Sequence, residues 1–193
     1  MAVEPWIQTY SGKQFNYLNP KPEMIDIEDI AHSLSMQCRY AGHCKFFYSV
    51  AEHSVHVGEA ISPEFAIYGL LHDAAEAYVT DIPTPLKQLI PEFRNIEFKV
   101  IQAIADKFDL NYKLFYSFPV KETDRHMLSV EADELIRRPF INDWPRLHRA
   151  RSMQIEISCW SPISCWSPII SQDIFLQKFE TYSNFPIALR EAV

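Results

Sequence analysis

Residues 70–87 read LLHDAAEAYVTDIPTPLK, an apolar helical pattern that also carries an imidazole, several carboxylates and a lysine. Those polar side chains are His72, Asp73, Glu76, Asp81 and Lys87. Imidazoles and carboxylates are costly to bury unless they form pairs or bind a metal ion. The stretch therefore predicts a metal site beside a mostly buried helix. Because adjacent helical positions point about 100° apart, other helices must supply the remaining ligands.

The whole chain has 193 residues, a length that suits one domain spanning residues 1–193. A net charge of −7 argues against broad electrostatic binding to nucleic acid or to an anionic membrane. No apolar run approaches the roughly 20 residues of a membrane span, and the first residues do not resemble a secretion signal. The cysteines form no CxxC pair, so we expect reduced thiols in a cytoplasmic protein. They are Cys38, Cys44, Cys159 and Cys165.

Apolar residues recur with helical spacing along most of the chain, which has only four glycines. The expected fold class is therefore all-α, a helical bundle preceded by a short irregular or hairpin segment around Ser11–Gly12. Asp26, Ser62 and Ser171 are the expected N-caps of three helices. The expected helices cover residues 24–36, 46–61, 62–79, 92–108, 120–138 and about 171–184.

One segment stands apart from the helical pattern. Residues 157–168 read ISCWSPISCWSP, two identical copies of a six-residue unit. A period of six matches no solenoid or propeller repeat, and the pattern favours a local duplication in a surface loop. Zinc binding by Cys159 and Cys165 would need a second ligand pair that the neighbouring sequence lacks. The repeat therefore predicts no function.

Two further positions complete a ligand set with the adjacent His72 and Asp73. His53 lies in the helical segment YSVAEHSV, among small residues that permit another helix to approach closely. Asp124 lies at the edge of an apolar face in VKETDRHML, where a carboxylate needs a partner. Three helices would then turn their ligands toward one point. Imidazole and carboxylate ligands together suit one divalent ion, with Mn, Fe, Co, Ni, Zn or Mg as candidates.

These residues resemble the motifs of the HD-domain phosphohydrolases, which are named after a His-Asp doublet. The matching stretches are EHS at residues 52–54, HDAAE at 72–76, TDIPTPLK at 80–87 and VKETD at 120–124. The resemblance covers roughly residues 26–136 and is closest to the bacterial 5′-deoxynucleotidases and the phage dATP triphosphohydrolase. Thr80 and Thr123 depart from the family pattern, in which Gly and Ala are usual, but neither change removes a ligand.

The resemblance implies that one metal ion is held by His53, His72, Asp73 and Asp124. Glu76 lies four residues after His72, on the same helix face, and is the expected general acid/base. Asp81 resembles the family residue that contacts the sugar end of the nucleotide or orients the leaving group.

The remaining expected contacts are with the substrate. Arg39 and Tyr40 resemble an arginine-aromatic pair of the family. Arg39 would clamp phosphate through a forked contact, and Tyr40 would stack on the base or sugar. Lys87 is the expected second phosphate contact and His43 a third.

The function that these features predict is hydrolysis of a deoxynucleotide by a metal-dependent enzyme from a bacterium or a phage. The substrate is either a 5′-deoxynucleoside monophosphate, which would release phosphate, or a deoxynucleoside triphosphate such as dATP, which would release triphosphate. The alternatives are a nucleotide sensor or binding module on the same helices, and a phosphodiesterase acting on another phosphoester. Relatives of this kind commonly self-associate, so we expect a homo-oligomer.

Overall fold

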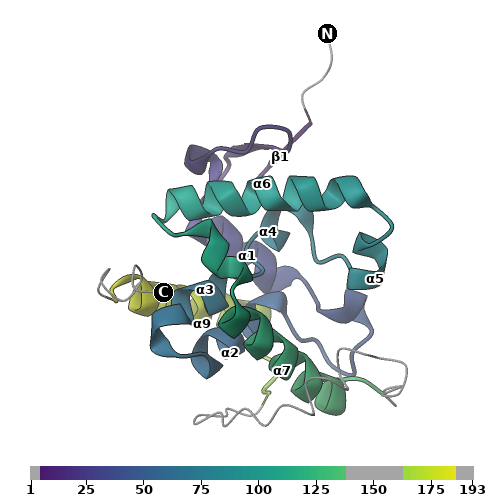
Figure 1. Ribbon diagram of the computed structural model, residues 1–193. Coiled ribbons are helices and arrows are strands. Elements are labelled where there is room, and N and C mark those ends of the chain that lie inside the picture. Colours follow the sequence, from purple (N-terminus) through teal and green to yellow (C-terminus); the bar gives the residue numbers. More distant parts are fainter. Residues whose placement is uncertain (1–4, 138–162, 186–193) are drawn as a thin grey trace.

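The computed structural model describes residues 5–137 and 163–185. These residues are mostly helical, with a two-stranded antiparallel hairpin at the N-terminal end (Figure 1). The strands are β1 (Trp6–Gln8) and β2 (Gln14–Asn16). The α-helices are α1 (Ile27–Met36), α2 (Val50–Ala60), α3 (Ala66–Leu71), α4 (Glu76–Val79), α5 (Thr84–Lys87), α6 (Pro91–Lys107), α7 (Phe118–Leu135) and α9 (Pro168–Ser183). Short 3-10 helices are η1 (Pro22–Met24), η2 (Tyr40–Gly42), η3 (Pro63–Phe65) and η4 (Tyr112–Tyr116).

The expected hairpin and most of the expected helices are confirmed. The hairpin pairs Ile7 with Phe15, and the turn includes Gly12 with a φ of 85°. Helix α1 begins after Asp26, whose side chain accepts a hydrogen bond from the Glu28 backbone N–H. None of the helices in the described part of the chain is long and apolar enough to cross a membrane.

The helix predicted over residues 62–79 is wrong as one continuous element. The chain forms η3 and α3, then a tight turn over residues 72–75, and then α4. The His72 Nδ1 atom lies 2.7 Å from the Gly69 carbonyl oxygen, which in a continuous α-helix would accept from the Asp73 N–H. The chain instead tightens, and the Glu76 N–H donates to the Asp73 carbonyl three residues back.

The start predicted for the C-terminal helix is also wrong. Helix α9 begins after Ser167, whose side chain accepts from the Ile170 N–H, and Pro168 occupies the first helical position. A Ser-Pro pair is a favourable helix start, so it nucleates the helix earlier than the expected cap, Ser171. Ser171 lies buried inside the helix, where its Oγ is 3.0 Å from the Oγ of Ser49.

Helix α2 lies at the centre of the bundle, packed against α3, α7 and α9. Every residue from Val50 to Gly58 is buried, including the charged ones. Gly58 and Gly69 let α2 and α3 meet backbone to backbone: a Cβ added to Gly69 would lie 3.1 Å from the Gly58 Cα atom. This close contact positions the His53-bearing helix against the segment that leads to His72.

The far face of α2 contacts the second copy of the six-residue repeat. The buried Glu52 carboxylate accepts hydrogen bonds from the backbone N–H groups of Ser164, at 3.2 Å, and Trp166, at 2.8 Å. The Trp166 ring also lies 5.2 Å from the His56 ring, measured between centroids. This copy is an irregular, partly exposed segment, as expected of a surface loop, and these contacts anchor it to α2. The first copy, with Cys159, lies outside the described residues.

Candidate metal centre

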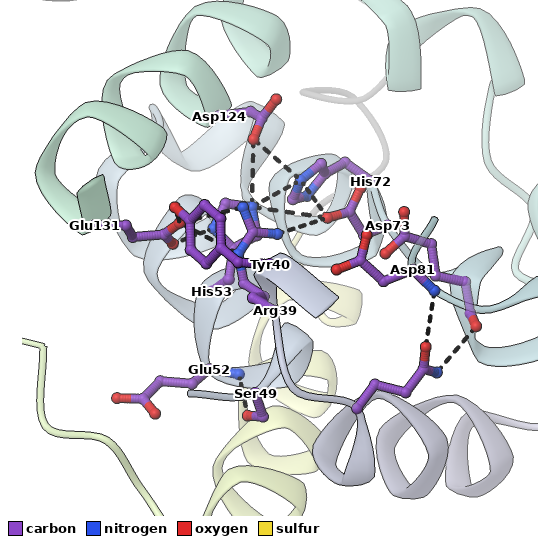
Figure 2. A network of polar contacts seen from close by, with 12 residues as sticks. Arg39, Tyr40, Ser49, Glu52, His53, His72, Asp73, Asp81, Asp124 and Glu131 are labelled. Atoms are coloured by element: carbon purple, nitrogen blue, oxygen red, sulfur yellow. Dashed lines mark hydrogen bonds and ion pairs between the residues drawn. The ribbon is translucent and has the colours of Figure 1, made fainter. Parts of the chain in front are cut away.

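Four side chains from three parts of the chain converge on one point (Figure 2). His53 comes from α2, His72 and Asp73 from the turn after α3, and Asp124 from α7. The ligand atoms of His53, His72 and Asp73 all lie within 4.8 Å of one another. Asp124 Oδ1 lies 3.3 Å from His53 Nε2 and 3.8 Å from His72 Nε2. The convergence predicted from the sequence is therefore present.

The spacings within this cluster suit one ion. The two imidazole Nε2 atoms of His53 and His72 lie 3.2 Å apart. The Oδ2 atom of Asp73 lies 3.2 Å from His72 Nε2 and 3.7 Å from His53 Nε2. Atoms that each lie about 2.0–2.2 Å from a shared metal ion are separated by roughly 3–3.5 Å when they are neighbours in its coordination sphere.

Hydrogen bonds on the far side of each imidazole determine which nitrogen faces the cluster. His72 Nδ1 donates to the Gly69 carbonyl oxygen, since that oxygen can only accept. His53 Nδ1 lies 2.5 Å from the ionised Glu131 carboxylate and donates to it for the same reason. When both imidazoles are neutral, the Nε2 lone pairs of His53 and His72 therefore face each other and the carboxylates of Asp73 and Asp124. These donor atoms fit a divalent metal ion, which would turn their mutual repulsion into ligation.

The charges of the cluster shift the pKa values of its members. Burial lowers the pKa of His72, but Asp73 and Asp124 outweigh burial and raise this pKa to about 9. Burial raises the pKa of Asp73, but His72, His53 and Arg39 together hold it well below its usual range. A metal ion must therefore displace a proton from His72 below about pH 9, so its affinity should rise with pH.

Glu131 is a site residue that the sequence interpretation missed. It is fully buried on α7, and its Oε1 accepts from His53 Nδ1 and, at 2.9 Å, from the Tyr48 hydroxyl. Its Oε2 accepts from the Tyr40 hydroxyl at 2.7 Å and from Arg39 Nε at 3.2 Å, and lies 3.1 Å from Arg39 Nη2. Burial raises the pKa of Glu131, but Arg39 and His53 outweigh burial and hold it at about 2. This carboxylate therefore orients the His53 imidazole.

The sequence does carry a signal for this residue. Glu131 follows Asp124 by seven residues, which is two helical turns, so both carboxylates lie on one face of α7. A second carboxylate on the face that carries a metal ligand indicates a hydrogen-bond partner for another ligand.

The expected substrate residues Arg39 and Tyr40 lie next to this cluster (Figure 2). The Arg39 guanidinium, only 11% exposed, contacts Glu131 and lies 3.5 Å from Asp73 Oδ2. The Tyr40 hydroxyl points to Glu131, and its ring lies 5.4 Å from the Arg39 guanidinium carbon. Tyr40 is thus joined to the same network through its hydroxyl, and stacking of its partly exposed ring on a base or sugar stays a prediction. His43 is exposed, and no contact described for it reaches the metal ligands.

Glu76 and Lys87, the expected catalytic residue and a phosphate contact, form an ion pair in which Glu76 is buried and Lys87 is partly exposed. Lys87 Nζ lies 3.0 Å from Glu76 Oε1 and 2.7 Å from Glu97 Oε1. The other oxygen of Glu76, Oε2, is buried without a hydrogen-bond partner in the described structure. Burial raises the pKa of Glu76 well above its usual value, and the charges of Asp73 and Asp81 add to this, against the opposing effect of Lys87. A carboxyl of this kind binds a proton more readily than an exposed glutamate does.

Asp81 lies just beyond α4, beside Asp73 (Figure 2). Its backbone N–H donates to the Gln37 side-chain oxygen at 2.9 Å, which fixes the chain after the positive φ of Thr80. Burial and the Asp73 charge raise the pKa of Asp81, while Arg39 lowers it. The side chain is therefore within electrostatic reach of the cluster, and its expected role at the sugar end or the leaving group stays a prediction.

Comparison with known proteins yields relatives without an assigned activity. The uncharacterized protein YfdR of Escherichia coli is 45% identical over 130 residues, which cover 67% of this chain and 72% of that protein. An uncharacterized protein of Rhodobacter capsulatus is 35% identical over 115 residues, which cover 54% of this chain and 59% of that protein. No family model matches the chain.

Proposed function

We propose that this chain, which belongs to the same protein family as YfdR of Escherichia coli, is an HD-domain phosphohydrolase dependent on a divalent metal ion. Its substrate would be a deoxynucleotide: a 5′-deoxynucleoside monophosphate, cleaved to nucleoside and phosphate, or a deoxynucleoside triphosphate, cleaved to nucleoside and triphosphate. The observation that carries the proposal is that the Nε2 atoms of His53 and His72 lie 3.2 Å apart, beside the Asp73 and Asp124 carboxylates.

A divalent ion held by His53, His72, Asp73 and Asp124 would lower the pKa of a water molecule and polarise a phosphate oxygen. The protein's own groups supply the proton transfers. Glu76 combines a raised pKa with an unpartnered oxygen, so it can take a proton from the attacking water and return one to the leaving group.

The cations of the site suit a phosphate group. Arg39 keeps its positive charge, because Glu131 and Asp73 raise its pKa well above the usual value despite burial. Lys87 likewise keeps its charge beside Glu76 and Glu97. Arg39 and Lys87 therefore supply positive charge for a small anionic substrate, whereas the net charge of −7 disfavours a long polyanion.

The test is a product assay with purified protein, Mn²⁺ or Co²⁺, and a panel of deoxynucleoside mono- and triphosphates. Orthophosphate and inorganic triphosphate are measured separately, so the bond that is cleaved is identified along with the preferred base. Glu76→Gln should abolish turnover while Co²⁺ still binds. Glu92→Gln, a matched change at an exposed position of α6, should leave turnover intact.

Turnover of some deoxynucleotides that disappears in Glu76→Gln supports the proposal. Co²⁺ binding at the four ligands without turnover of any nucleotide would overturn it. The same site would then be assigned to a sensor or to another phosphoester.

A further inference from the structure

Two cysteines meet beside the candidate metal centre. The Sγ atoms of Cys38 and Cys44 lie 3.4 Å apart, and both side chains are partly exposed. A disulfide needs an S–S distance of about 2.05 Å, so a small approach of the two sulfurs would suffice to join them. The pair is therefore positioned for bond formation and accessible to a small oxidant.

The backbone between the cysteines is shaped to bring them together. Tyr40, Ala41 and Gly42 have successive φ values of 57°, 51° and 80°, which reverse the chain direction within a few residues. Non-glycine residues rarely adopt this conformation, and a run of such residues persists only where the surroundings impose it.

Hydrogen bonds hold both ends of this loop. The Arg39 N–H, next to Cys38, donates to the Tyr48 carbonyl at 2.9 Å. The Lys45 N–H, next to Cys44, donates to the Leu135 carbonyl at 2.8 Å. The sulfurs are thus held near each other by main-chain contacts on both sides, rather than by a chance side-chain encounter.

We propose that Cys38 and Cys44 form a reversible disulfide that closes the loop carrying Arg39 and Tyr40. The oxidant is a low-molecular-weight disulfide such as oxidised glutathione. The Cys38 thiolate attacks one of its sulfurs, the glutathione S–S bond breaks, and one glutathione leaves. The Cys44 thiolate then attacks Cys38 Sγ and displaces the second glutathione. Two protein thiols are oxidised, one glutathione disulfide is reduced, and the two thiol protons pass to the two glutathiones.

The environment of Cys44 is consistent with oxidation of the pair to a disulfide. Burial and the hydrogen bond with Cys38 raise the pKa of Cys44 to about 11. The Cys44 thiol is therefore not stabilised as a thiolate, which is the feature that makes some disulfides easy to reduce. The proposal does not depend on phosphohydrolase activity, since it concerns only the two sulfurs.

The chain offers a direct readout of the bond. Arg39 separates the two cysteines, so trypsin places Cys38 in the peptide that ends at Arg39 and Cys44 in the peptide YAGHCK, residues 40–45. The full chain is incubated with oxidised glutathione, free thiols are alkylated under denaturing conditions, and the digest is analysed by mass spectrometry. The expected product is these two peptides joined, with the number of alkylated thiols falling from four to two.

Matched variants test the pairing. Cys165→Ser should retain the joined peptides, although Cys165 lies close enough to Cys38 for the charge of Cys38 to raise the pKa of Cys165. In Cys44→Ser the reaction should stop after the first step, with glutathione attached to Cys38, because the second thiol is missing. Dithiothreitol should restore all four thiols in the wild-type chain. Four free thiols after oxidation, glutathione attached to Cys38 in the wild type, or Cys38 joined to Cys165 would each overturn the proposal, whatever the nucleotide assay gives.

Discussion

Replacement of Glu131 by glutamine tests whether this buried carboxylate supports the metal centre. The amide of Glu131→Gln fills the same space, but it is neutral. The carboxylate that accepts the 2.5 Å hydrogen bond from His53 Nδ1 is thereby lost. Charge-assisted hydrogen bonds are about twice as strong as neutral ones, so the His53 imidazole becomes a weaker and less ordered ligand. The charge of Arg39, which Glu131 neutralises at 3.1 Å, would then also oppose a bound cation.

Loss of such a supporting contact typically lowers metal affinity by about 10- to 100-fold. That range corresponds to roughly 1.4–2.7 kcal/mol in binding free energy. The assay is titration of the apoprotein with Co²⁺, followed by calorimetry or visible absorption, with circular dichroism to verify the fold. Glu134→Gln is the matched control, because Glu134 is exposed on the same helix. Wild-type Co²⁺ affinity in a folded Glu131→Gln protein would refute the reasoning.

Three further predictions concern catalysis, pH and the repeat. Glu76→Gln should lower turnover by about 10²–10⁴-fold with Co²⁺ affinity retained, as steady-state assays and titration would measure; equal losses in both would contradict a proton-transfer role. Burial lowers the pKa of His56, but Glu52 and Glu59 outweigh burial and raise this pKa to about 9. The protonated His56 therefore stabilises the folded protein below about pH 6.5, and this stabilisation is lost as the pH rises through 9. Wild type should then lose about 3 kcal/mol more than His56→Gln between pH 6.5 and 9 in urea unfolding, and parallel curves would refute the assignment. Deletion of residues 163–168 leaves one intact copy of the repeat before α9, so the melting temperature should change by no more than about 2 °C. Trp166→Ala in the full-length chain should instead cost at least about 1 kcal/mol, and the reverse order would show that copy number matters.

The sequence predicted the convergence of the four candidate ligands because each lies in a segment whose sequence has clear helical periodicity. His53 and Asp124 needed only the correct helix faces to meet, and those faces follow from the positions of apolar residues, whereas His72 and Asp73 lie in the turn directly after α3. The hairpin was predictable from a local turn around Gly12. These features depend on short-range rules that a single sequence contains.

The features that were missed depend on contacts between distant segments or on local competition. The Gly69 carbonyl is taken by the His72 side chain, which interrupts the helix that periodicity predicts. The Glu52 carboxylate binds backbone N–H groups at Ser164 and Trp166, more than a hundred residues away, and no local pattern encodes that contact. The early start of α9 could have been predicted from Ser167-Pro168, a Ser-Pro pair like Ser62-Pro63, which was used to predict a helix start.

The glycine contact between α2 and α3 has a consequence for protein engineering. Because Gly58 and Gly69 bring the two main chains together, the separation of the imidazoles on either side is set by backbone packing rather than by adjustable side chains. A library that varied Asp73, Asp124 and the surrounding loops, while keeping both glycines, would retain a preformed pair of histidine ligands. Such a scaffold would allow selection for binding of a chosen metal, with the carboxylates as the variable part of the coordination sphere.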